Sequence, residues 1–386
     1  MFRLVSAGLL AAGLTLPSPA VAQSSPFWGP LQPGKYGVGV DVLTAEDLSR
    51  APASTSAAHA TAPRSRQIRM AVWYPTQQRD AKRTLTLAQL AAQICEKRPT
   101  DLETVDQCWP ELKQLLTDPQ AGTDVLTRLA AMPTASRLRA PHAGRFPVIV
   151  FDTGMNGPAS FYFSLSEFLA SHGYVAVCIP SFGLEPGKPN GFDMRGLETK
   201  TLDIAAAINA LPRLPYADPA KIALAAWSVG GASAALAQMR SGLVSAFISL
   251  DGATTYKYGW DMMQQSPFFD LARATVPHLQ FTGKQPNRFN VPRDFSYFEK
   301  IQSKEAYAAE VEAFNHSHFF AQGGVLQFAG QQTPAAAEFW SSHAACSRVL
   351  LAFLDAFIKG DAAARTRLEK PAAEDAARIT LRRRAS

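Results

Sequence analysis

The sequence has few charged residues, few cysteines and no long hydrophobic run beyond its first residues. Only 18% of its 386 residues are charged and 47% are apolar, which is typical of a globular protein with a large core. None of the four cysteines has the spacing to histidines that zinc sites show. Beyond residue 16, no apolar stretch reaches the ~20 residues that a membrane-spanning helix needs. We therefore expect a protein that needs no metal and does not insert stably into a membrane.

The sequence also lacks a stripe of interleaved basic and aromatic residues, which would favour a nucleic-acid-binding surface. The formal net charge is +6, and much of the excess lies in a C-terminal run at Arg378, Arg382, Arg383 and Arg384. A terminal basic run is usually a solvated end of the chain. The sequence therefore predicts no nucleic-acid partner.

The first 22 residues have the three parts of a secretory signal peptide in the required order. Arg3 gives a positive start, an apolar run covers 4–16, and the segment ends in the small-residue pattern Ala20-Val21-Ala22. Cleavage after Ala22 would remove Arg3 and leave a mature chain with a net charge of +5. The sequence therefore predicts a secreted or periplasmic protein that begins near Gln23.

Export makes disulfide bonds possible, so the cysteines need an interpretation. Cys95 and Cys108 lie in a polar segment with helical character, and we expect them to pair. Cys178 lies within an apolar strand pattern, where a free cysteine behaves as a small core residue. Cys346 falls in a late helix.

Strand and helix patterns alternate along most of the chain. Continuous apolar strands separated by helices predict a mostly parallel sheet that is covered on both faces. The fold class is therefore α/β, with 23–386 as a single domain and 79–144 as a helical insertion or lid between early strands. The expected strands are 35–43, 67–74, 147–152, 174–179, 221–227, 244–250, 277–282 and 309–314, and the expected helices are 86–97, 110–117, 123–132, 159–171, 197–211, 230–240 and 335–358.

A serine stands at the junction of one such strand and the next helix. The segment 222–232 reads IALAAWSVGGA, so the apolar strand runs directly into Ser228 and a helix of small residues. A sharp strand-to-helix turn of this kind exposes a serine oxygen for nucleophilic attack, and small neighbours are needed because the turn is crowded. The usual pattern is Gly-x-Ser-x-Gly, and here Ala226 takes the first position. Ser228 is the predicted nucleophile.

A serine hydroxyl is a weak nucleophile and needs a base that an acid orients. When the serine lies on a strand-to-helix turn, the acid and then the histidine follow it along the chain. Asp251 comes directly after the strand 244–250, at the sheet edge where ligands gather in open α/β sheets. Asp294 is the alternative, but it lies far behind the strand 277–282. We therefore predict Asp251 as the acid.

Two histidines compete for the role of the base. His316 and His318 both follow the last predicted strand, whereas His278 falls within a strand and His343 within the final helix. We favour His316, because Phe319 lies three residues later as an apolar anchor. His318 remains the alternative.

Two backbone N–H groups must face the charge that develops on the substrate oxygen. One is expected from Val229, the residue after the nucleophile. The other is expected from Met155, in the loop after the strand 147–152, where Gly154 lets the backbone approach closely.

Together, these motifs resemble the platelet-activating-factor acetylhydrolase and dienelactone-hydrolase-like branch of the α/β hydrolases. The resemblance covers nearly the whole mature chain and implies a Ser–Asp–His acyl hydrolase that needs no metal or other cofactor, with Asp251 as the acid and His316 as the base. The chain departs from this family's pattern at Thr153, where a histidine is usual, and at Ala226. Ser228 also argues against dienelactone hydrolysis proper, which uses a cysteine. The matching segments are PGKYGVG at 33–39, DLSR at 47–50, VWYP at 72–75, the loop around Gly154, SHGY at 171–174, LDG at 250–252 and HSHF at 316–319.

The sequence thus predicts an exported hydrolase of carboxylic esters that works through an acyl-enzyme. Trp227, Phe161 and Phe319 are the expected neighbours of an apolar pocket, and lipids, short synthetic esters and polyester chains are all possible substrates. An amidase or peptidase with the same triad is one alternative. A non-catalytic exported binding protein on a hydrolase scaffold is another.

Overall fold

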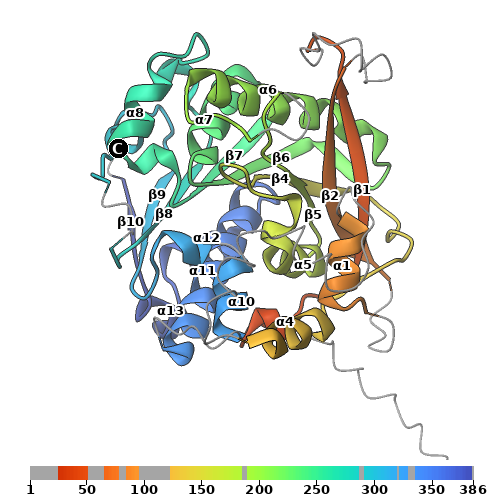
Figure 1. Cartoon of the computed structure of the whole chain (residues 1–386). Helices are drawn as coiled ribbons and strands as arrows, with labels where there is room; N and C mark the ends of the chain where they lie inside the picture. The colour runs from red at the N-terminus through yellow and green to blue at the C-terminus, as the bar shows by residue number, and fades with distance from the viewer. Residues whose placement is uncertain are drawn as a thin grey trace, which may run out of the picture.

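A computed structural model describes residues 25–50, 65–77, 84–94, 122–184, 189–286, 291–319, 321–328 and 335–384 (Figure 1). The predicted signal peptide, the predicted helix 110–117 and both Cys95 and Cys108 lie outside these residues. The described cysteines, Cys178 and Cys346, are both buried and free.

The described strands form one ten-stranded sheet in the order β10-β9-β8-β7-β6-β4-β5-β2-β1-β3. The six strands from β9 to β5 in this order run parallel to one another, β2 is antiparallel to both β1 and β5, and β10 is antiparallel to β9. The mostly parallel sheet that the sequence predicts is confirmed. The strands are β1 (Gly37–Asp47), β2 (Arg66–Thr76), β3 (Ser136–Arg137), β4 (Phe146–Asp152), β5 (Val175–Ile179), β6 (Ala217–Trp227), β7 (Val244–Leu250), β8 (His278–Gly283), β9 (Ala306–Val311) and β10 (Ile379–Arg383).

Helices cover both faces of this sheet, with a separate apolar core on each (Figure 1). Successive residues of β4 alternate between the two cores: Ile149 and Phe151 point into one, Val148 and Val150 into the other. The first core is covered by α1 (Leu87–Ile94), α4 (Gly122–Ala131), α5 (Phe163–Ser171), α11 (Ala336–Phe357) and α12 (Ala362–Glu369). The second is covered by α6 (Met194–Ala210), α7 (Gly230–Arg240), α8 (Lys257–Met263) and α9 (Ser296–Lys300).

Further helical segments complete the described part of the chain. They are η1 (Pro26–Trp28), η4 (Ala159–Tyr162), η5 (Leu211–Arg213), η6 (Ala253–Thr255), η7 (Leu271–Arg273), η8 (His316–Phe319), α10 (Ala321–Phe328) and α13 (Ala373–Ala376). No helix in the described part of the chain is long and apolar enough to cross a membrane.

Several predicted elements differ from the structure in their bounds, among them the strand 221–227, since β6 already begins at Ala217. The predicted helix 159–171 is split into η4 and α5, and α6 begins at Met194 because the Asp193 side chain caps it by accepting the Gly196 N–H. The predicted strand 309–314 is wrong by three residues, since β9 starts at Ala306. The chain leaves the sheet after Val311, which lets Phe314 turn into the core.

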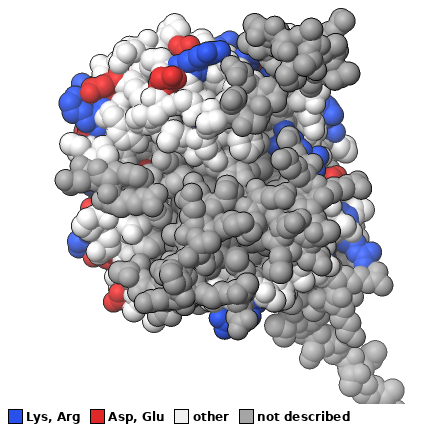
Figure 2. Space-filling model, viewed as in Figure 1, with Lys and Arg blue, Asp and Glu red and all other residues white. Residues whose placement is uncertain are grey.

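The basic C-terminal end is not a solvated tail, so that prediction was wrong. Ile379–Arg383 pairs with β9 as an edge strand, and Ile379 lies in the core. The arginines are held by partners: Arg383 forms an ion pair with Glu305 at 2.9 Å, and Arg384 donates to the Ser303 carbonyl at 2.5 Å. On the face that Figure 2 shows, acidic and basic side chains of the described residues lie side by side near the edge of the view.

The structure describes 84–94 and 122–144 of the predicted insertion, and these parts pack against the sheet. Leu87 and Leu90 of α1 are buried in the first core, and β3 pairs with β1. Glu167 of α5 anchors this segment, because its carboxylate accepts the backbone N–H groups of Ala135 and Ser136 at 3.0 and 2.9 Å. Burial raises the pKa of Glu167 to about 7.

Candidate active site

Ser228 lies on the sharp turn between β6 and α7. Its backbone φ is +56°, an uncommon value for a residue with a side chain, and its carbonyl accepts the Gly231 and Ala253 N–H groups at 2.9 and 2.6 Å. A side chain at Gly230 would place its Cβ 2.5 Å from the Asp152 carboxylate, and one at Gly231 would lie 2.7 Å from the Gly252 backbone. The two glycines therefore let the turn pack against the neighbouring strand ends.

Three of the predicted residues meet at this turn. His316 Nε2 lies 3.0 Å from Ser228 Oγ, and His316 Nδ1 lies 2.6 Å from Asp251 Oδ2. Ser228 follows β6, Asp251 follows β7 and His316 begins η8 after β9, so carboxyl ends of parallel strands supply all three. A serine, an imidazole and a carboxylate in this hydrogen-bonded order can transfer a proton away from the serine oxygen.

Asp251 is fully buried and surrounded by donors. The Tyr256 hydroxyl donates to Oδ2 at 2.8 Å, and Arg293 forms an ion pair with Oδ1 at 2.7 Å. Burial alone would raise the pKa of Asp251, but the hydrogen bond from His316 and the charge of Arg293 outweigh it and lower the pKa below its usual value. Asp251 is therefore held as a carboxylate.

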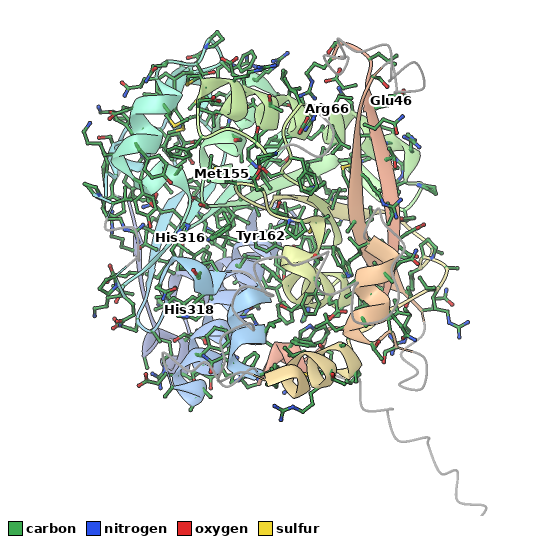
Figure 3. All side chains as sticks on the ribbon, viewed as in Figure 1. Glu46, Arg66, Met155, Tyr162, His316 and His318 are labelled. Carbon is green, nitrogen blue, oxygen red and sulfur yellow. The ribbon has the colours of Figure 1, made fainter. Side chains whose placement is uncertain are left out.

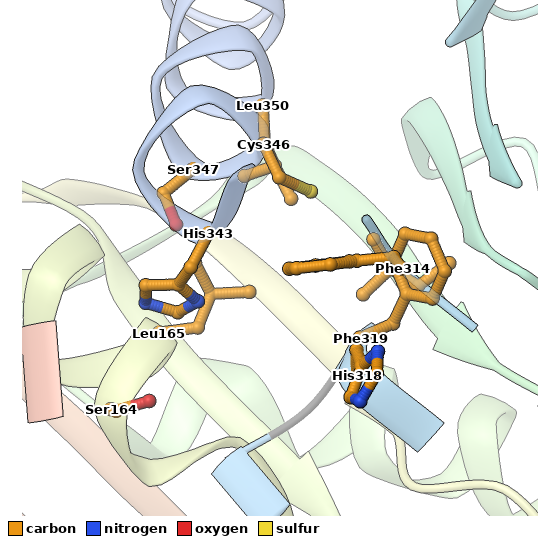
Figure 4. Close-up of a pocket in the computed structure, with 10 residues that line it drawn as sticks. Ser164, Leu165, Phe314, His318, Phe319, His343, Cys346, Ser347 and Leu350 are labelled. Carbon is orange, nitrogen blue, oxygen red and sulfur yellow. The ribbon is translucent and has the colours of Figure 1, made fainter. Parts of the chain in front are cut away.

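The other predicted acid and base lie elsewhere. His318 accepts the Asn315 N–H at 3.0 Å and lines a cavity of about 20 Å³ together with His343 and Cys346 (Figure 4). In Figure 3, His318 lies farther than His316 from the loop that carries Met155. The Asp294 carboxylate accepts the Ser296 N–H at 2.7 Å. Of the two candidate bases the structure brings His316 to Ser228, and of the two candidate acids it brings Asp251 to His316.

The loop after β4 lies against the turn. Gly154 has a φ of +80°, and a Cβ there would be 2.5 Å from the Trp227 ring, so only glycine fits. Within the described part of the chain, the N–H groups of Met155 and Val229 donate to no protein acceptor. Both groups are therefore available to a substrate oxygen.

A buried lysine supports this loop from beneath. Lys200 of α6 is 2% exposed, and its Nζ donates to Asp152 Oδ1 at 2.6 Å, to the Gly154 carbonyl at 2.8 Å and to Ser181 Oγ at 2.6 Å. Asp152 Oδ1 also accepts the Gly154 N–H at 3.0 Å.

Sequence reasoning missed Lys200, Tyr256 and Arg293. Lys200 had a usable signal, because it falls at helical spacing from Leu197 and Ile204 on the buried face of α6. Arg293 lies in the loop after β8, next to Asp294, and no local pattern links it to Asp251.

The predicted pocket residues occupy different environments. Trp227 stacks on His316 with ring centroids 4.7 Å apart and donates its indole N–H to the His316 carbonyl at 2.8 Å. Phe319 is buried against Phe314. The side chain of Phe161 lies outside the described part of the structure. Contact of these three with a substrate stays a prediction.

Comparisons with known proteins agree with this geometry. A family model described as chlorophyllase matches residues 119–263, a span that includes Ser228 and Asp251. No curated protein sequence matches the chain. A solved structure of a ferulic acid esterase from Streptomyces cinnamoneus is similar, with a TM-score of 0.65 and 18% identity, over 90% of this chain and 96% of that one.

These likenesses bear on the fold and leave the narrower resemblance to the platelet-activating-factor acetylhydrolase and dienelactone-hydrolase-like branch as a prediction. The described residues include no cluster of three or more histidine, cysteine or acidic side chains that could hold a metal ion. The sheet order, the turn at Ser228 and the structural likeness agree on one architecture. The chain has the α/β-hydrolase fold.

Proposed function

We propose that this protein is an exported serine hydrolase that cleaves carboxylic esters. The observation that carries the proposal is the hydrogen-bonded sequence Ser228–His316–Asp251, with 3.0 and 2.6 Å between its members. Both comparisons point in the same direction, since the similar solved structure is an esterase by name and the chlorophyllase model spans the nucleophile turn.

The proposed reaction follows from these distances. His316 Nε2 takes the proton of Ser228 Oγ as this oxygen attacks the ester carbonyl, and Asp251 stabilises the imidazolium that forms. His316 then returns the proton to the leaving alcohol, which produces an acyl-enzyme. Water, activated by the same imidazole, releases the acid and restores Ser228.

The substrate oxygen becomes negatively charged when the carbonyl is attacked. The N–H groups of Met155 and Val229 are the proposed donors to this oxyanion, because neither has a protein acceptor among the described residues. Loss of one such donor typically slows an enzyme by about 100- to 1,000-fold.

A row of aromatic rings beside His316 favours an ester with an aromatic or extended apolar group. Tyr256 packs edge-to-face against His316 with ring centroids 6.1 Å apart. Tyr258 stacks on Tyr256 with a centroid distance of 5.7 Å, and the Phe192 ring lies 5.3 Å from that of Tyr258. Phe192 is 53% exposed whereas Tyr256 is 2% exposed, so only the outer rings of the row are open to a substrate. Such rings stack well on flat apolar groups. Lipid-like esters, short synthetic esters and polyester chains remain alternatives within the same reaction.

A fluorophosphonate probe and an ester panel test the proposal. The probe is expected to label the mature protein but not Ser228→Ala, and the panel should span acyl chain lengths and aryl acids. Absence of labelling in folded wild-type protein would favour the non-catalytic binding protein. Faster cleavage of matched anilides than of esters would favour the amidase or peptidase.

The choice of base has a matched pair of variants. His316→Ala is expected to abolish labelling by the same probe, whereas His318→Ala should keep it, because only His316 reaches Ser228. The opposite pattern would reverse the assignment. Export is tested separately, by finding whether the mature chain begins near Gln23 after secretion.

A further inference from the structure

A lysine rarely lies inside a protein without a reason, and Lys200 lies directly beneath the loop that carries Met155. Its ammonium has three protons, and three acceptors surround it: Asp152 Oδ1, the Gly154 carbonyl and Ser181 Oγ, at 2.6, 2.8 and 2.6 Å. Ser181 in turn holds the loop, since its hydroxyl accepts the Asn156 N–H at 3.3 Å. Two donors of this lysine are therefore directed at the loop and the end of β4, and the third is directed at Ser181 after β5, which itself holds the loop.

One of these contacts falls on the peptide group that matters for the proposed reaction. The Gly154 carbonyl and the Met155 N–H belong to the same peptide bond. A peptide bond is planar and trans, so its C=O and N–H groups point in opposite directions. When Lys200 holds the oxygen of this peptide, it also fixes the direction of the N–H. A cation on the carbonyl oxygen additionally withdraws electrons from the peptide and makes its N–H a stronger donor.

The backbone of the loop after β4 is also fixed by contacts other than those of Lys200. Gly154 has a φ of +80° and lies against Trp227, while its own N–H is held by Asp152. Asp152 in turn lies beneath Gly230 of the nucleophile turn, where no Cβ would fit. The loop and the turn that present the two proposed oxyanion donors are thus built around the Lys200–Asp152 ion pair.

We infer that Lys200 is a positioning residue of the oxyanion hole, which holds and polarises the Gly154–Met155 peptide so that the Met155 N–H faces the substrate oxygen. The inference rests on the proposed ester hydrolysis. Lys200 touches no substrate atom in this role, and its contribution is realised only when the oxyanion forms.

The test is Lys200→Met, which keeps the length of the side chain and removes the charge and all three donors. The substrates are p-nitrophenyl acetate and its thionoester, in which sulfur replaces the carbonyl oxygen and accepts N–H groups poorly. We expect kcat for the normal ester to fall by about 10- to 100-fold, less than on loss of a direct donor, with KM changed by less than about threefold. The preference of the enzyme for the oxygen ester over the thionoester should fall by about tenfold, because the sulfur compound gains less from the hole.

Arg66→Met is the matched control. Arg66 is also buried and is paired with a carboxylate of α6, Asp203, at 2.6 and 2.5 Å, but it contacts no residue of the 152–157 loop among the described hydrogen bonds. Lys200→Met leaves the buried Asp152 carboxylate without its ion pair, whereas Asp203 keeps Arg50 at 2.8 Å in Arg66→Met. Both variants should lower the melting temperature, Arg66→Met by less. Only Lys200→Met should change the preference for the oxygen ester. Equal slowing of both substrates by Lys200→Met, or an equal change of preference in Arg66→Met, would overturn the inference.

A second variant covers the case in which Lys200→Met does not fold. Lys200→Met combined with Asp152→Asn leaves no unpaired buried charge, and the amide oxygen of asparagine can still accept the Gly154 N–H. We expect this double variant to show the same loss of preference for the oxygen ester. A folded double variant with the wild-type preference would overturn the inference. If the wild-type protein itself cleaves no ester, the proposed function fails instead.

Discussion

Two buried aspartates flank the nucleophile. β6, which leads to Ser228, lies between β4 and β7 in the sheet, and each neighbour carries a carboxylate at its carboxyl end, Asp152 on β4 and Asp251 after β7. They are 4% and 0% exposed. Each forms one close ion pair, with Lys200 at 2.6 Å and with Arg293 at 2.7 Å.

The two aspartates differ in the second group that each carboxylate binds besides its ion-pair partner. Asp251 binds a side chain that must gain and lose a proton, His316 at 2.6 Å, whereas Asp152 binds a backbone N–H, that of Gly154 at 3.0 Å. The same residue type at equivalent strand ends therefore supports two parts of one site. One aspartate orients the proposed base, and the other shapes the proposed oxyanion loop.

The largest expected effect separates these two roles. Asp251→Asn keeps the size of the side chain but removes the charge that stabilises the imidazolium and fixes its tautomer, so kcat should fall by about 10⁴-fold. The measurement is steady-state hydrolysis of a p-nitrophenyl ester. A loss of less than tenfold would mean that Asp251 does not act as the acid of the triad.

Asp152→Asn, the same substitution on the other aspartate, should lower kcat much less than Asp251→Asn. Asp152→Asn can still accept the Gly154 N–H but weakens the hold on Lys200, so we expect kcat to fall by about tenfold, with KM nearly unchanged. The same assay measures it. If Asp152→Asn were as damaging as Asp251→Asn, the division of roles between the two aspartates would be wrong.

The sequence predicts one of these aspartates and not the other, for a physical reason. Asp251 follows a clear apolar strand and has a known place in the chain order of a hydrolase triad, so local pattern was sufficient. Asp152 also ends an apolar strand, but its role depends on Lys200, which lies 48 residues later on α6. No local pattern links the two. The spacing of Lys200 on the buried face of α6 was the one available indication.

The choice between His316 and His318 shows a similar limit. Both residues lie in η8, a 3₁₀ segment with about three residues per turn, so side chains two positions apart point in different directions. Which direction faces Ser228 depends on how η8 is docked after β9, and β9 itself begins three residues earlier than its sequence suggests. The C-terminal strand β10 escaped prediction because Arg382 and Arg383 hide its short alternating pattern, and pairing with β9 decides its structure.

The two aspartates should also respond to pH in opposite ways. Burial would raise the pKa of Asp251, but its donors lower it, so this carboxylate stabilises the fold above the unfolded pKa of about 3.9 and loses that effect as pH falls through the folded value. Burial raises the pKa of Asp152 and outweighs the opposing charge of Lys200, so its contribution to stability falls as pH rises above about 3.9.

Urea unfolding of the wild type, Asp251→Asn and Asp152→Asn between pH 3 and 8 measures this difference. The stability advantage of the wild type over Asp251→Asn should grow as pH rises from the acid end, whereas its advantage over Asp152→Asn should shrink. Slopes of the same sign for both variants would contradict the opposite pKa directions.

The smallest expected effect concerns a contact that only Asp251 has. The Tyr256 hydroxyl donates to the same oxygen that holds His316, at 2.8 Å. Tyr256→Phe keeps the ring against His316 and removes one neutral hydrogen bond, which is worth about 1 kcal/mol, so kcat should fall by about three- to fivefold. Tyr307→Phe on β9, which removes a hydroxyl that donates to Glu305, serves as the control and should keep kcat at the wild-type level. An unchanged kcat in Tyr256→Phe would mean that His316 and Arg293 alone hold Asp251, whereas a loss of 100-fold or more would place the hydroxyl in the proton-transfer machinery itself.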